Sequence, residues 1–128
     1  MKTLEEYRDE FNYLTEEFDR TYKTAVDIKK LVSLYDTVIS TYESQDSDMK
    51  DVFATVMDAV NIQRVNYSLS AIKFVLKKRI DDMMSLYNSV SGRATNFDII
   101  SHEFGDWSDL ALNIYDKSTS LKKKIDKI

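Results

Sequence analysis

Side chains that could bind a metal ion are concentrated near residue 105. His102 and Asp106 are four positions apart and would share one face of a helix, with Glu103 and Asp109 beside them. A catalytic zinc ion normally has three strong protein ligands, and His102 is the only histidine in the chain. Capping and salt bridging at a helix irregularity explain the same residues, so we expect no metal and no other cofactor.

The remaining polar residues do not indicate catalysis. Asp81 and Asp82 are adjacent and would point in different directions on a helix, which does not suit a general acid paired with a general base. The chain has no cysteine, and it contains neither a nucleophile motif nor a glycine-rich phosphate-binding loop. Solvation of a helix surface explains the many carboxylates, and we therefore expect a protein that is not an enzyme.

The longest regular pattern is an apolar row that runs through residues 4–42 in alternating steps of three and four. Glycine and proline are absent from it, and Thr21 is its only polar member. A 3.5-residue period keeps one face of a helix directed at a partner helix, as in a coiled coil. The pattern predicts a helix of about 60 Å over residues 3–43, capped by Thr3 and Glu6. Its members are Leu4, Tyr7, Phe11, Leu14, Phe18, Thr21, Ala25, Ile28, Val32, Tyr35, Ile39 and Tyr42.

A second helix is predicted after the polar connection at residues 43–48. Apolar residues recur through residues 48–91 and indicate a helix there. The most polar patch of this helix, at residues 61–66, is where we expect a bend or a break. Gly92 follows the last apolar position and predicts the C-terminal end of the helix.

A third helix is predicted between Thr95, its expected N-cap, and the end of the chain. Gly105 interrupts its apolar row and costs roughly 1 kcal/mol relative to alanine. A kink or break near Gly105 would therefore divide this helix and produce a fourth short segment. The row contains Phe97, Ile100, Phe104, Trp107, Ala111, Ile114, Ser118, Leu121, Ile125 and Ile128.

These helices define the predicted fold. The chain of 128 residues is 43% hydrophobic and 31% charged, which is typical of one folded helical domain over residues 1–128. We predict an all-α, elongated, antiparallel three-helix bundle with coiled-coil-like packing. Charge supports this pairing, because residues 1–48 contain six basic and twelve acidic residues, whereas residues 49–92 contain six and four. With a turn near residue 45, the basic run 77–79 lies opposite the acidic stretch 10–17.

The predicted helices differ in length, which leaves an apolar surface at one end. The third helix is too short to cover the turn between the first two, so residues 33–58 would project by about 15 Å. Exposed apolar surface of that size usually marks an interaction site. In the alternative, the helices break earlier and a fourth short helix covers these side chains. The predicted partner-binding residues are Leu34, Val38, Tyr42, Val52, Phe53, Val56 and Met57.

Two clusters of basic residues form a second predicted surface. Such clusters can contact nucleic acid or an anionic membrane. Cations near the C-terminal end of a helix also offset the helix dipole, which requires no ligand. The clusters are Lys77, Lys78 and Arg79 in the second helix and Lys122, Lys123 and Lys124 near the C-terminus.

One short stretch resembles a known family. The run Asp51-Val52-Phe53-Ala54-Thr55-Val56-Met57 is similar to part of the central helical hairpin of the T4-type phage terminase small subunit. The resemblance covers these seven residues and implies a phage or bacterial assembly factor. Neither an apolar leader nor a membrane span is evident in the sequence, so we expect a cytoplasmic or, for a phage protein, a virion-internal location.

The sequence as a whole predicts a non-enzymatic protein–protein interaction or assembly module, such as an adaptor or a chaperone-like component. It would act through apolar helix faces, and its partner would be another protein or a second copy of the chain. Binding of nucleic acid or an anionic membrane through the basic helix ends is an alternative, although neither is the expected partner. Inhibition of a host or competitor protein is a further alternative, which uses the same kind of contact.

Overall fold

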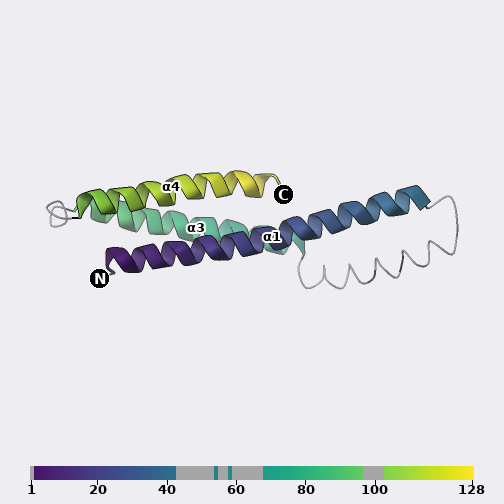
Figure 1. Cartoon of the computed structure of the whole chain (residues 1–128), viewed down its shortest axis with the longest axis horizontal. Coiled ribbons are helices and arrows are strands. Elements are labelled where there is room, and N and C mark those ends of the chain that lie inside the picture. The colour runs from purple at the N-terminus through teal and green to yellow at the C-terminus, as the bar shows by residue number, and fades with distance from the viewer. Residues whose placement is uncertain (1, 43–53, 55–57, 59–67, 97–102) are drawn as a thin grey trace.

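Three helices account for most of the described chain. The computed structural model describes residues 2–42, 54, 58, 68–96 and 103–128. The helices are α1 (Leu4–Tyr42), α3 (Leu69–Ala94) and α4 (Phe104–Asp126). Figure 1 shows α3 and α4 lying along the N-terminal part of α1. The described residues therefore form an all-α three-helix bundle, as the sequence predicts.

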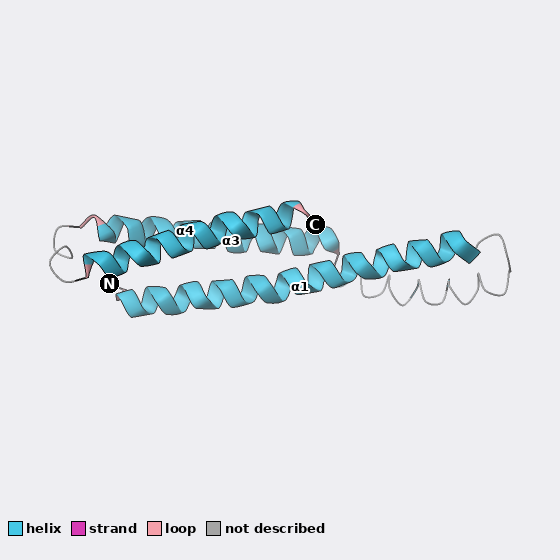
Figure 2. Ribbon diagram, turned by 45° about the horizontal axis from the view of Figure 1, so that its top comes forward, coloured by secondary structure: helices cyan, strands magenta, loops and turns pink. Residues whose placement is uncertain are grey.

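The three helices alternate in direction. Tyr7 near the start of α1 contacts Trp107 near the start of α4, with 5.7 Å between the ring centres. At the other end of α4, the Lys29 ammonium of α1 donates a hydrogen bond of 3.1 Å to the carbonyl oxygen of Lys127. α1 and α4 are therefore parallel, and α3 runs antiparallel to both (Figure 2). The most extensive interface is between α3 and α4, followed by that between α1 and α3.

The apolar row of α1 forms one wall of the core. The Thr3 hydroxyl accepts a hydrogen bond of 3.2 Å from the backbone N–H of Glu6, which confirms Thr3 as the cap of this helix. From this cap to about residue 28, the row faces α3 and α4. Its buried members are Tyr7, Leu14, Phe18 and Ala25, with Leu4, Phe11 and Ile28 packed at the edges.

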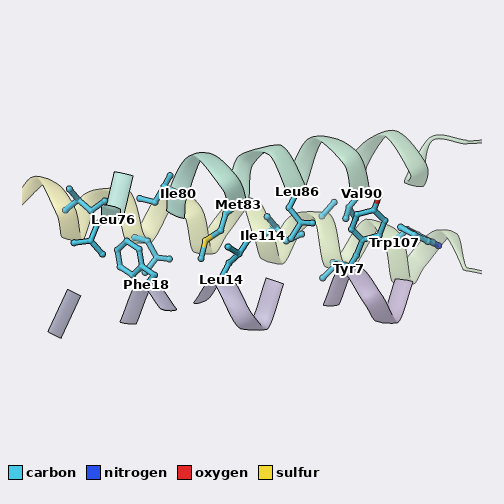
Figure 3. Packing of buried hydrophobic residues seen from close by; sticks show 14 of the residues in the cluster. Tyr7, Leu14, Phe18, Leu76, Ile80, Met83, Leu86, Val90, Trp107 and Ile114 are labelled. Carbon is cyan, nitrogen blue, oxygen red and sulfur yellow. The ribbon is translucent and has the colours of Figure 1, made fainter. Parts of the chain in front are cut away.

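The other two walls of the core come from rows on α3 and α4. Figure 3 shows Leu14 of α1, Met83 of α3 and Ile114 of α4 pointing toward one another. Phe104 is exposed, which contradicts its predicted place in the α4 row, because this residue begins α4 one turn before the core starts at Trp107. The buried residues of α3 include Ile72, Leu76, Ile80, Met83, Leu86 and Val90, and those of α4 include Trp107, Ala111, Ile114, Leu121 and Ile125.

The second predicted helix is interrupted at Ser68. Ser68 has a non-helical backbone, and its hydroxyl accepts a hydrogen bond of 3.2 Å from the N–H of Ala71, so α3 begins at Leu69. A continuous helix over residues 48–91 is therefore wrong. The interruption at Ser68 comes just after the polar patch 61–66, which itself lies outside the described residues.

The connection between α3 and α4 is also misplaced in the prediction. α3 continues through Gly92 to Ala94, and Thr95 is its C-cap rather than the N-cap of the next helix. The backbone of Gly92 does not adopt the left-handed conformation with which a glycine commonly ends a helix. α4 begins at Phe104, so the interruption predicted near Gly105 falls just before that residue.

The C-terminal part of α1 extends beyond the other two described helices. α4 ends level with Lys29, and α3 begins at Leu69, so residues 30–42 of α1 run past both (Figures 1 and 2). We call residues 30–42 the projecting segment. At 1.5 Å per residue it is about 20 Å long.

Candidate functional site

The projecting segment carries exposed apolar side chains. Leu34 is 62% exposed and Leu31 is 42% exposed. Val38 and Tyr42 follow Leu34 in steps of four on the same helix. Among the predicted partner-binding residues, Leu34 is therefore placed on an exposed face of α1. The side chains of Val38 and Tyr42 and the whole of Val52, Phe53, Val56 and Met57 lie outside the described residues.

The structure divides the predicted basic cluster at residues 77–79. Lys77 and Lys78 are exposed to solvent. Arg79 is half-buried and faces α1, where its guanidinium lies 3.7 Å from the carboxylate of Glu17. The predicted pairing of this basic run with the acidic stretch of α1 is confirmed at this ion pair. Arg79 consequently acts between two helices of the bundle rather than on an open basic surface.

The lysines at the end of α4 are exposed, and one of them contacts α1. The ammonium group of Lys124 lies 5.5 Å from the centre of the Tyr22 ring of α1, which is the arrangement of a cation–π contact. Lys123 and Lys124 also lie in the last turn of α4, where positive charge offsets the helix dipole. Lys122 lies on a different side of the helix and borders the groove between α3 and α4.

That groove brings together charges of both signs. Lys77 and Asp81 line it from α3, and Lys122 and Asp126 line it from α4. A surface that binds nucleic acid or an anionic membrane needs cations without interleaved anions. The predicted basic surface is therefore not one continuous positive patch. Sequence reasoning missed this groove, although the shared four-residue spacing of the two Lys–Asp pairs is visible in the sequence.

An aromatic and charged cluster joins all three helices near the N-terminal end of α1. The Arg93 guanidinium of α3 lies 5.6 Å from the centre of the Tyr7 ring and 5.5 Å from the centre of the Trp107 ring. The indole N–H of Trp107 donates a hydrogen bond of 3.1 Å to the Glu103 carboxylate. A buried tryptophan with its N–H satisfied and a cation over its face is a strong structural contact. Sequence reasoning missed this role of Arg93, because the residue lies just after the predicted end of its helix.

The structure describes most of the residues considered for metal binding and acid–base chemistry. Within the described residues, no three histidine, cysteine or carboxylate side chains are close enough to bind one metal ion. Glu103 binds Trp107, and His102 lies outside the described residues. Asp81 borders the groove between α3 and α4, whereas Asp82 lines a separate hollow between α3 and α1. The two aspartates therefore point in different directions, as expected.

Comparisons of the chain with protein-family models, with curated proteins and with solved structures found no match. The resemblance of residues 51–57 to the terminase small subunit therefore stays a prediction. Among the described helices, none combines the length and the apolar character needed to cross a membrane.

Proposed function

We propose that this protein is a non-enzymatic protein-binding module that packs the projecting segment of α1 against an apolar helix of a partner protein. The observation that carries this proposal is the 62% exposure of Leu34 in a part of α1 that extends beyond α3 and α4. Fully burying one exposed leucine side chain contributes roughly 1.5–3 kcal/mol. Leu31, one turn earlier, is also exposed and would be covered by the same partner.

The spacing within the projecting segment favours a helix as the partner. Leu31, Leu34 and Val38 recur in steps of three and four, which suits packing against one helix. α1 is already helical through Tyr42, so binding would not require this segment to fold first. Such preorganisation reduces the entropy lost on association. An adaptor, a chaperone-like component or a phage or bacterial assembly factor would use a surface of this kind, as would an inhibitor of another protein.

Binding of nucleic acid or an anionic membrane is the weaker candidate. Arg79 and Lys124 are engaged in contacts with α1. Acidic residues share the groove between α3 and α4 with Lys77 and Lys122. These neighbours lower the attraction of the remaining lysines for a phosphate-rich surface.

Site-specific cross-linking tests the proposed protein partner. A photoreactive amino acid replaces Leu34 in one variant and the exposed polar residue Ser33 in the matched control. The two positions lie about 100° apart around the helix. After illumination in an extract of the source cells, the Leu34 variant should form a product with one protein that the Ser33 variant does not form.

The cross-linked protein is then purified and titrated against substituted chains. Leu34→Asp should weaken its binding by at least about tenfold, because a carboxylate would be buried in an apolar contact. Ser33→Asp should leave the affinity unchanged. The same cross-links from both positions, or undiminished binding of Leu34→Asp, would overturn the proposal.

A further inference from the structure

The outward faces of α3 and α4 each carry a second row of residues at helical spacing. Both rows advance in steps of three and four, so each keeps to one face of its helix. All their members are exposed except Met84, which is half-buried. The α3 row consists of Phe74, Lys77, Asp81 and Met84, and the α4 row consists of Leu112, Tyr115, Thr119, Lys122 and Asp126.

All members of the two rows except Phe74 and Leu112 line the groove between α3 and α4. Ile80 and Ile125 supply apolar surface to this groove, and Ser118 lies between them and Tyr115. The Ser118 side chain is 1% exposed, and its hydroxyl has no hydrogen-bond partner within the described residues. An unsatisfied buried hydroxyl is unfavourable, so the groove would be stabilised by a polar group that reaches it from outside.

The antiparallel register of α3 and α4 determines which charges face each other. The rings of Tyr87 and Tyr115 lie side by side with their centres 5.5 Å apart, which fixes the alignment of the two helices. None of the four charged residues in the groove makes an ion pair with another described residue. Following the helices from the ring contact, these charges face each other in two pairs, Lys77 with Asp126 and Asp81 with Lys122.

We propose that this groove is the contact surface of a two-fold symmetric dimer in which α3 of one copy packs antiparallel to α3 of the other. In chain order the α3 row is apolar, basic, acidic and apolar. Two antiparallel copies of this row therefore place opposite charges against each other and apolar residues against each other. Around a two-fold axis midway between Lys77 and Asp81, Lys77 of one copy meets Asp81 of the other. Phe74 of each copy then meets Met84 of the other, which makes a favourable thioether–aromatic contact.

The same axis also suits α4. Lys122 and Asp126 are four residues apart, as Lys77 and Asp81 are, and the register places the midpoints of the two pairs level with each other. Lys122 of one copy therefore meets Asp126 of the other. One axis thus gives every charged residue of the two rows an opposite charge in the facing copy, which favours self-association in this orientation.

Other occupants match the groove less well. A nucleic acid or an anionic membrane would be repelled by Asp81 and Asp126. An uncharged apolar helix would cover Phe74, which is 70% exposed, but it would offer no opposite charges to the charged residues that it covers. A second copy of the chain covers Phe74 and matches the charges. This dimer does not depend on the function proposed for the projecting segment, because the two surfaces share no residue.

Complementary charge reversals in the full chain test the dimer by sedimentation equilibrium. At about 0.1 mM the wild-type chain should approach twice the 14.9 kDa of one copy. Lys77→Glu places like charges together at two symmetric positions and should raise the dimer Kd by at least about tenfold. Asp81→Lys should do the same. Lys78→Glu alters an exposed lysine outside the row and should leave the Kd unchanged.

Mixing the two charge-reversed variants distinguishes the loss of an intermolecular contact from a damaged fold. In a mixed dimer, the Lys77→Glu chain meets the Asp81→Lys chain with opposite charges at both positions, so equal amounts of the two variants should associate as tightly as the wild type. A monomeric wild-type chain, a mixture that does not associate, or an equal effect of Lys78→Glu would overturn the proposal. Leu34→Asp should leave the dimer intact, which distinguishes this result from failure of the projecting segment to bind.

Discussion

The carboxylate of Glu17 on α1 lies 3.7 Å from the guanidinium of Arg79 on α3. Both side chains are mostly buried, and the Nε atom of Arg79 has no hydrogen-bond partner within the described residues. Glu17 also receives a hydrogen bond of 2.6 Å from Arg20 on its own helix. The ion pair therefore joins two helices at a place where solvent screens charge only in part, and it favours one register of α1 against α3.

Replacing Glu17 with glutamine should lower the free energy of unfolding by about 1–2 kcal/mol, because the half-buried charge of Arg79 loses its counter-charge. Urea denaturation followed by circular dichroism measures this difference. Glu16→Gln removes an exposed carboxylate one position away and should change the free energy of unfolding by no more than about 0.5 kcal/mol. Equal stability of Glu17→Gln and the wild type would show that the ion pair does not stabilise the bundle.

The cluster of Tyr7, Arg93 and Trp107 should be a major contributor to stability. Trp107→Ala removes a buried ring that contacts both other residues, and it should cost about 3–5 kcal/mol. Trp107→Phe keeps a ring but loses the hydrogen bond to Glu103, so it should cost less. The matched control is Phe104→Ala, one turn earlier and exposed, with an expected change within about 1 kcal/mol. Similar losses for Phe104→Ala and Trp107→Ala in thermal unfolding would contradict the assigned start of the core.

Gly92→Ala should stabilise the protein. Gly92 lies inside α3, and no atom lies within 4 Å of a Cβ built at this position. Alanine is favoured over glycine in a helix interior by about 1 kcal/mol, so the free energy of unfolding should rise by roughly 0.5–1 kcal/mol. Gly105→Ala, at the second residue of α4, should have a similar effect, because both glycines lie within one turn of a helix end. A lower unfolding midpoint for Gly92→Ala would mean that α3 ends before this residue in solution.

The core could be predicted from sequence because it depends on a period that persists over many residues. The row of α1 as far as Ile28 and the row around Ile72 and Met83 pack into the core as their spacing indicates. Helix ends depend on single hydrogen bonds, and the cap at Ser68 is one serine among many in the chain. For that reason the start of α3 and the role of Thr95 were not predictable from pattern alone.

The residues that meet between two helices could not be predicted, because they depend on the register of the helices, as the pairing of α1 with α3 illustrates. A turn near residue 45 places Arg79 opposite residue 12, whereas it contacts Glu17, more than one helical turn away. An error of that size is enough to pair Lys77 or Asp81 with the wrong neighbours. Leu34 was predictable as exposed because its exposure follows from helix length rather than from register.

Ser118 provides a final test of the bundle's interior. It is the polar member of the buried row of α4, and its hydroxyl has no hydrogen-bond partner among the described residues. Removal of an unsatisfied buried hydroxyl should raise the free energy of unfolding, so Ser118→Ala should stabilise the protein by about 1 kcal/mol beyond any change in helix propensity. Ser120→Ala, on the exposed side of the same turn, measures the propensity contribution alone. Both variants are compared by urea denaturation at a protein concentration low enough to keep the chain monomeric. If Ser118→Ala gains no more than Ser120→Ala, the Ser118 hydroxyl has a hydrogen-bond partner in solution.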